Sequence, residues 1–304
     1  MNAFLFPGQG SQFSGMGQDL ADNFPVARHV FEEANDALGF DLAALCFSGS
    51  EEDLKLTANT LPALLTSRAH ERSGLAQETD LAPTFAAGHS LGEYSALVAV
   101  GALTLADAVK TVRQRGTFMQ EAVPVGVGAM AAIMGVDAPE LVKICEQAAE
   151  GEVVAPANFN SPGQIVIAGH ATAVERAMTL AKEAGAKRAL PLPVSAPFHS
   201  ALMQPAAQRL AEELETVPVG DFRCPVIGNV EAAPYDNSER VKPLLVEQVC
   251  AAVRWDESVL KMSELGVSHF IEIGPGKVLS GLAKRIAKGT TAQNIGTVTD
   301  LKKI

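Results

Sequence analysis

Short apolar runs alternate along the chain with longer segments in which apolar residues recur every three or four positions. The short runs are typical of buried β-strands and the longer segments of amphipathic helices. The pattern predicts strands over 4–6, 84–87, 129–136, 153–158, 164–168, 187–194, 225–229 and 268–273. It predicts helices over 25–38, 62–77, 92–100, 104–121, 138–150, 171–185 and 277–287, one from about 205, and two within 242–265. This alternation indicates an α/β fold.

The stretch from 123 to 195 has an element order of its own, strand-helix-strand-strand-helix-strand. This order is that of the ferredoxin-like arrangement. We therefore expect a ferredoxin-like small subdomain at 123–195. It would be inserted into a larger α/β domain built from 1–122 and 196–304.

Composition and charge narrow the class of protein. The 304 residues are 47% hydrophobic and 19% charged, as in an ordinary globular protein. The net charge of −11 argues against nucleic acid as a partner, because phosphate binding needs a basic surface. The longest central apolar run, 96–103, is too short to cross a membrane, and the N-terminus lacks the basic start of a secretory signal. The four cysteines are scattered, so we expect no metal site and a cytoplasmic protein with reduced thiols.

The segment Gly88-His89-Ser90-Leu91-Gly92 fits the pattern Gly-x-Ser-x-Gly between an expected strand and an expected helix. In that context the serine lies on a sharp turn that exposes its hydroxyl, and the amide of the next residue can stabilise an oxyanion. The pattern predicts Ser90 as a nucleophile. It also predicts that the large domain is α/β-hydrolase-like with a parallel sheet. A glycine-rich turn with an incidental serine is the alternative interpretation.

A serine nucleophile needs a base within hydrogen-bonding reach. Among the six histidines, His199 lies in the loop 193–200, where the chain leaves the small subdomain and re-enters the large domain. Loops at such junctions line clefts and carry catalytic groups. His89 adjoins the serine, but neighbouring side chains at a sharp turn point apart. On this evidence a helix-capping or solvent-facing His199 is an equally good interpretation.

Arg115 lies on the apolar stripe of the helix expected over 104–121, three residues after Val112 and four before Met119. An arginine that faces a core is costly unless acceptors satisfy it, and its planar fork suits a carboxylate. One hypothesis is a clamp for a carboxylated acyl group on Ser90. The other is a structural salt bridge to a nearby Asp or Glu.

Together these segments resemble the malonyl-CoA:acyl-carrier-protein transacylases of fatty acid synthesis, over essentially the whole chain. The motifs that carry the resemblance are 6–12, 88–96, 115–116 with 119–120, 128–132, 158–164, 197–200 and 272–276. The resemblance implies a two-step exchange. Ser90, deprotonated by His199, takes the malonyl group from malonyl-CoA, and the phosphopantetheine thiol of acyl carrier protein then removes it. No cofactor is implied, because coenzyme A enters as a thioester substrate.

The resemblance also assigns supporting roles. The oxyanion would lie between the backbone N–H groups of Gln9 and Leu91, and His199 would be oriented by an acceptor at Gln248. Arg115 would hold the malonyl carboxylate, and Asn160 would lie in a loop that lines the same cleft. The bulk of Phe198 would disfavour an extra methyl group on the substrate, although one methyl is worth only about 1–3 kcal/mol. A core aromatic without a role in selection is the alternative for Phe198.

Two segments depart from the family pattern. Leu61 stands where the family usually has a glutamine that faces the cleft. The segment 67–74, Ser-Arg-Ala-His-Glu-Arg-Ser-Gly, replaces a usually apolar helix. Its charged residues and glycine predict a helix that is only weakly buried.

Other functions remain open at this level. The same serine turn could serve a thioesterase or hydrolase, or an acyltransferase for a polyketide carrier protein. A dinucleotide site at Gly8-x-Gly10 lacks the third glycine of the usual fingerprint. We expect a monomer that partners malonyl-CoA and the acidic acyl carrier protein, and no membrane. The candidate docking residues are basic: Lys187, Arg188, Lys284, Arg285 and Lys288.

Overall fold

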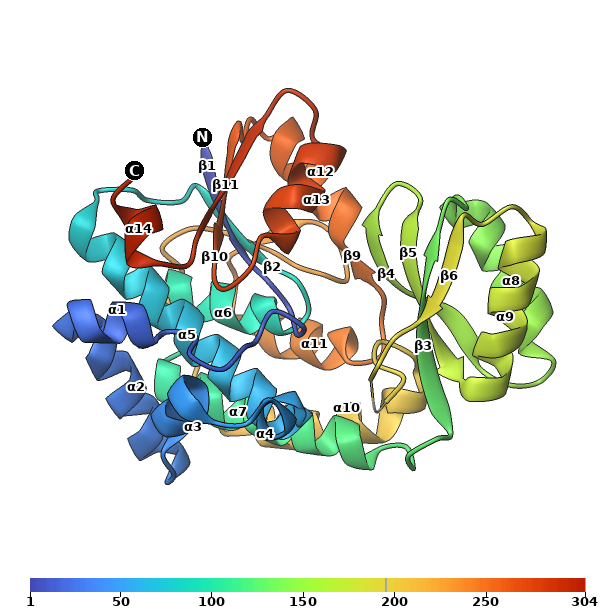
Figure 1. The fold of residues 1–304 in the computed structure, drawn as a ribbon, viewed down its shortest axis with the longest axis horizontal. Coiled ribbons are helices and arrows are strands. Elements are labelled where there is room, and N and C mark those ends of the chain that lie inside the picture. The colour runs from blue at the N-terminus through green and yellow to red at the C-terminus, as the bar shows by residue number, and fades with distance from the viewer. Residues whose placement is uncertain (195, 304) are drawn as a thin grey trace.

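The computed structural model describes residues 1–194 and 196–303, which form two packed α/β units (Figure 1). The first unit contains a six-stranded sheet in which all neighbouring strands are parallel except the last pair. Its strands, in spatial order, are β11 (Thr291–Ile295), β10 (His269–Ile273), β1 (Asn2–Phe6), β2 (Phe85–Gly88), β7 (Val226–Ile227) and β8 (Pro234–Tyr235).

Helices cover both faces of this sheet, and successive residues of β1 divide between the two. Ala3 and Leu5 pack into one cluster with α12 (Trp255–Glu264) and α13 (Val278–Ile286). Phe4 and Phe6 point the other way, into the main core, as the two-residue period of a strand requires. The helices that contribute to this core are α1 (Gln18–Asn23), α2 (Pro25–Leu38), α3 (Leu42–Ser48), α4 (Glu51–Lys55), α5 (Thr57–Glu78), α6 (Leu91–Val100), α7 (Leu105–Glu121), α10 (Gln204–Glu215), α11 (Ser238–Gln248) and α14 (Val298–Leu301).

The second unit is a five-stranded sheet with two helices on one face. Its spatial order is β6 (Arg188–Pro191), β3 (Gly128–Met134), β5 (Gln164–His170), β4 (Val154–Ser161) and β9 (Val253–Arg254), and only the β4–β9 pair is parallel. Ala131 and Ile133 face the helices α8 (Ala138–Ala149) and α9 (Ala171–Glu183). Met130 and Ala132 face the main core instead, so the open face of this sheet packs against the first unit.

The predicted mixed α/β fold is confirmed, and most predicted elements lie within a few residues of the observed ones. Short elements were not predicted: α1, α3, α4, α14 and strands β8, β9 and β11. Helix α5 begins at Thr57 rather than Pro62, so its first turn precedes the proline, which lies inside the helix. None of the helices formed by the described residues has both the length and the apolar composition of a membrane-spanning segment.

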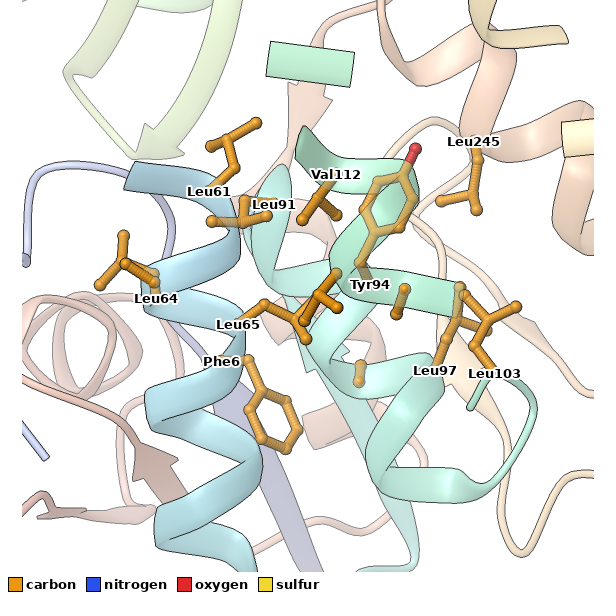
Figure 2. Packing of buried hydrophobic residues seen from close by; sticks show 14 of the residues in the cluster. Phe6, Leu61, Leu64, Leu65, Leu91, Tyr94, Leu97, Leu103, Val112 and Leu245 are labelled. Carbon is orange, nitrogen blue, oxygen red and sulfur yellow. The ribbon is translucent and has the colours of Figure 1, made fainter. Parts of the chain in front are cut away.

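The prediction that 67–74 is weakly buried is wrong. Arg68, His70 and Glu71 are almost completely buried on α5, which packs against α2, α6 and α7. The leucines of the first half of α5 anchor the helix, and Leu65 lies with Phe6 between α5 and α6 in Figure 2. The polar groups that follow are therefore drawn into the interior. Burial raises the pKa of Glu71 well above its usual value and lowers the pKa of His70.

Candidate active site

Ser90 lies on the turn between β2 and α6, with φ 50° and ψ −107°. A positive φ at a non-glycine residue stores roughly 1–3 kcal/mol of strain, which the surrounding packing must hold. The flanking glycines permit that packing. A Cβ at Gly92 would lie 1.9 Å from the Phe6 carbonyl oxygen, and one at Gly88 would lie 1.9 Å from Gly92. The turn therefore requires Gly92 for the close approach of α6 to β1, and Gly88 for the close approach of β2 to the first residues of α6.

Asn229, which follows β7, fixes the backbone of the turn from its other side. Its Oδ1 accepts a hydrogen bond from the Ser90 N–H at 2.7 Å, and its Nδ2 donates to the Gly88 carbonyl at 2.6 Å. The side chain of one asparagine thus satisfies two polar groups of the strained turn, which otherwise would be buried without partners.

His199 Nε2 lies 2.8 Å from Ser90 Oγ. The other ring nitrogen, Nδ1, lies 2.8 Å from the Gln248 carbonyl oxygen and 3.2 Å from that of Ala251. Carbonyls only accept hydrogen bonds, so Nδ1 carries the proton and Nε2 is left to accept the serine proton. Burial, and secondarily the charge of Arg115, lowers the pKa of His199 to about 3. The imidazole is therefore a neutral base at ordinary pH.

Arg115 is 2% exposed and lies beside the serine. Its Nη2 donates to Ser90 Oγ at 3.2 Å and to Gln248 Oε1 at 3.1 Å, and its guanidinium carbon lies 5.7 Å from the centre of the Tyr94 ring. Among the described residues it forms no ion pair with a carboxylate, and its Nη1 donates to none of them. The structural salt bridge considered from the sequence is therefore not formed.

Gln248 connects the base, the nucleophile and the arginine. Its backbone carbonyl accepts from His199, and its side-chain Nε2 donates to the Ser90 carbonyl at 3.1 Å and to Glu93 Oε2 at 2.7 Å. Glu93 also accepts from the Asn229 N–H and from the Tyr235 hydroxyl. Burial raises the pKa of Glu93 to about 7, although three donors favour its carboxylate form.

A cavity of about 550 Å³ lies between the two units, and both the nucleophile and the base open onto it. The first unit contributes the serine turn and the loop after β1, and the second contributes residues of β3, β4 and the segment after β6. Its wall includes Gln9, Gln12, Lys55, Thr57, Leu61, His89, Ser90, Leu91, Arg115, Met119, Met130, Asn158, Leu192, Pro193, Val194, Phe198 and His199. Neither the Gln9 N–H nor the Leu91 N–H donates a hydrogen bond to any described residue.

The predicted positions Phe198 and Asn160 differ in their relation to the cavity. Phe198 lines the cavity, as does Leu61, the residue that departs from the family pattern. Asn160 belongs to strand β4 rather than to a loop, and it is not among the residues that line the cavity. Its Oδ1 instead accepts from His89 Nε2 at 2.8 Å. The structure thus places Asn160 behind a cavity wall. Ser195, in the loop before His199, lies outside the described residues.

Asn229, Glu93 and Tyr235 were not singled out from the sequence. A signal was present for two of them. Asn229 ends a predicted strand, at the edge where parallel sheets carry their sites, and Glu93 is the one charged residue of helix α6. Within the described residues, no group of three or more His, Cys, Asp or Glu is arranged to hold a metal ion.

Comparison with known proteins gives one consistent result. The family model described as "Acyl transferase domain" matches residues 3–301. The chain is similar to the malonyl CoA-acyl carrier protein transacylase of Escherichia coli K12, with 53% identity over 95% of this chain and 94% of the relative. It is also similar to the enzyme of that name from Bacillus subtilis, with 54% identity over 93% and 90% of the two chains.

Solved structures agree with the sequence comparison. An acyl carrier protein S-malonyltransferase from Vibrio cholerae superposes with a TM-score of 0.97 at 49% identity, covering 99% of both chains. A malonyl-transacylase in complex with its type II PKS acyl-carrier protein also has a TM-score of 0.97, at 48% identity, covering 99% of this chain and 98% of that chain.

Proposed function

The chain belongs to the acyl transferase domain family, and on that premise we propose how its cavity transfers a malonyl group from malonyl-CoA to the thiol of acyl carrier protein. The enzyme is a malonyl-CoA:acyl-carrier-protein transacylase in activity, as are its relatives of about 50% identity over nearly the full chain. The observation that carries the malonyl specificity is Arg115. This buried cation faces the cavity beside Ser90 and has no carboxylate partner among the described residues.

In the first half-reaction Ser90 Oγ attacks the thioester carbonyl while His199 Nε2 takes its proton. The carbonyls of Gln248 and Ala251 stabilise the imidazolium by accepting from Nδ1–H. The unpartnered amides of Gln9 and Leu91 would receive the oxyanion, and Leu91 adds the positive end of helix α6. The tetrahedral intermediate collapses, coenzyme A leaves with the proton from His199, and malonyl-Ser90 remains.

The second half-reaction runs the same chemistry in reverse. The phosphopantetheine thiol gives its proton to His199 and attacks malonyl-Ser90. The same two amides would hold the second oxyanion, and Ser90 Oγ regains its proton as the malonyl thioester leaves. Arg115 would hold the malonyl carboxylate throughout with Nη1, since Nη2 already contacts Ser90 and Gln248.

Two further residues would shape the acyl pocket. Phe198 lies on its wall immediately before His199, so its ring would meet an extra methyl group on the malonyl α-carbon. Asn160 would act through His89, whose ring it fixes at the cavity wall. We propose this indirect role in place of direct substrate contact.

Carrier-protein docking is proposed at a second, surface hollow of about 400 Å³, which is lined by Lys187 from the second unit and Arg285 from the first. Three further basic residues that are close to these two in the sequence are also exposed: Arg188, Lys284 and Lys288. An acidic carrier protein would complement these cations although the chain as a whole is acidic. A fatty acid carrier is the primary proposal. The structural relative bound to a polyketide carrier favours the polyketide carrier as the second candidate.

The architecture supports finer assignments that we also propose. Residues 1–122 and 196–304 would form an α/β-hydrolase-like domain, because a strand, Ser90 and helix α6 form its nucleophile turn. Residues 123–195 would form a ferredoxin-like subdomain, with strand order β6-β3-β5-β4 and both helices on one face. Strand β9 extends that sheet from outside this range. A cytoplasmic location is proposed because the four cysteines are free thiols, as expected in a reducing compartment.

The proposed function is tested by incubating the protein with malonyl-CoA and holo acyl carrier protein and measuring malonyl-carrier protein. We expect transfer by the wild type and none by Ser90→Ala. A thioesterase would release free malonate at the same rate with or without the carrier. That result would contradict the proposal.

A further inference from the structure

In the buried polar segment of α5, Arg68 contacts the loop after β1. Arg68 Nη2 donates to the Gly8 carbonyl oxygen at 3.1 Å, and Arg68 Nη1 donates to Ser95 Oγ on α6 at 3.3 Å. The arginine stem packs beside Gly274, where a Cβ would lie 3.3 Å from its Cγ. The side chain is completely buried, so the position of its guanidinium is fixed by packing.

The Gly8 carbonyl and the Gln9 N–H belong to the same peptide group. The described chain has no cis peptide bond, so in this group the C=O and the N–H point in opposite directions. The carbonyl side faces Arg68 and the hydroxyl of Ser11, which donates to it at 3.3 Å. The N–H belongs to a residue that lines the cavity and has no partner among the described residues.

We propose that Arg68 is a positioning residue for the oxyanion hole: it holds and polarises the Gly8–Gln9 peptide group so that the Gln9 N–H stays aimed at the reacting carbonyl. This inference rests on the proposed function, in which Gln9 stabilises the oxyanion. A charged donor on a carbonyl strengthens the N–H of the same amide, because hydrogen bonds in a chain polarise one another. A rigid, preorganised donor is also what oxyanion stabilisation requires.

The charges around Arg68 favour this role. Glu71 and Glu272 lie near enough to favour its protonated form, although burial lowers its pKa to about 9. Glu272 already accepts three hydrogen bonds, from the Leu279 N–H and from the N–H and hydroxyl of Ser280. The guanidinium therefore remains a cation at neutral pH, with the Gly8 carbonyl and Ser95 as its acceptors among the described residues.

The test replaces Arg68 while controlling for the buried carboxyl group of Glu71. The variants are Arg68→Met, Arg68→Met with Glu71→Gln, Arg68→Lys, and the matched controls Glu71→Gln and Ser95→Ala, which keep the Gly8 contact. The readouts are the single-turnover rate of malonyl-Ser90 formation at saturating malonyl-CoA, the half-saturating concentration, the pH profile and the Gln9 amide resonance in NMR.

Losing a whole oxyanion donor costs about 10²–10³-fold in rate, so misaligning one should cost roughly tenfold. We expect that loss in both Met variants, with half-saturation and pH profile unchanged and the Gln9 resonance shifted. Arg68→Lys should recover part of the acylation rate, and the acylation rates of both controls should stay within about twofold of the wild-type rate. If the folded Met variants acylate at the wild-type rate, or the Gln9 resonance does not move, the proposal is wrong. A wild-type protein that forms no malonyl-Ser90 would instead overturn the proposed function, and the Gln9 resonance would still decide whether Arg68 orients the peptide.

Discussion

His199 Nε2 and Ser90 Oγ are 2.8 Å apart, and both residues have positive φ angles, 57° and 50°. Neither is a glycine, so each position stores strain that its neighbours must hold. The Ser90 turn is held by Asn229 and Gln248, and the His199 ring by the carbonyls of Gln248 and Ala251. The strained pair is therefore prealigned before substrate arrives.

The low pKa of His199 predicts an unusual pH profile. A base must be neutral, and His199 loses that state only as pH falls toward its pKa of about 3. We expect kcat/KM for Ser90 acylation to stay level from pH 8 down to about 5, where a histidine of ordinary pKa near 6.5 would already be protonated. A half-loss of kcat/KM near pH 6.5 that persists in Glu93→Gln, which removes the neighbouring carboxyl group with a pKa of about 7, would contradict the assignment.

Substrate should shift this profile. A malonyl carboxylate on Arg115 neutralises a charge that lowers the pKa of His199, so the pKa rises in the complex. The acid limb of kcat should therefore lie at higher pH than that of kcat/KM, because the former reports the bound enzyme. Rate profiles that extend down to the His199 pKa of about 3 measure both limbs; coincident limbs would argue against the contact.

Replacing Arg115 should change acyl preference. Arg115→Gln removes a charge-assisted pair worth about 2–3 kcal/mol, so kcat/KM for malonyl-CoA should fall on the order of 100-fold. The ratio of acetyl to malonyl transfer should rise. Arg113→Gln is the matched control, because Arg113 is on the same helix but stacks on Phe40. Equal losses for both acyl groups would mean that Arg115 supports the fold rather than the substrate.

Gly88 and Gly92, the two glycines of the Ser90 turn, should tolerate no side chain. Gly92→Ala would place a methyl group 1.9 Å from the Phe6 carbonyl oxygen, so we expect loss of acylation and a destabilisation of at least about 3 kcal/mol. Gly281→Ala on α13 meets open space within a helix and should be neutral or stabilising by up to about 1 kcal/mol. Urea unfolding of both variants makes the comparison; a stable, active Gly92→Ala would refute the packing argument.

Docking should depend on charge. Reversing Lys187 and Arg285 to Glu should raise KM for acyl carrier protein about tenfold or more, with little change for malonyl-CoA. Wild-type KM for the carrier should rise with salt, because exposed charges are screened. Lys110→Glu, exposed on α7, is the control. A KM for acyl carrier protein that changes with neither the salt concentration nor the double charge reversal would exclude this surface as the docking site.

Local pattern was enough to predict the parts of the site that depend on neighbouring residues. The Ser90 turn follows from a strand, two glycines and a helix, and the buried position of Arg115 follows from helical spacing. Asn229 was missed because its partners Ser90 and Gly88 are about 140 residues away, in a contact that only the folded sheet creates. The burial of 67–74 was missed for the same reason. Helical periodicity compares only the residues of one segment with each other, whereas the burial of α5 results from its packing against α2, α6 and α7.

The covalent intermediate is the central claim, and the mass of the intact protein after brief exposure to malonyl-CoA, without carrier protein, tests it most directly. We predict one malonyl group per chain, mapped by peptide analysis to Ser90, absent in Ser90→Ala and released by a pantetheine thiol. An unmodified wild-type protein that still transfers malonyl groups, or an adduct on another residue, would contradict it.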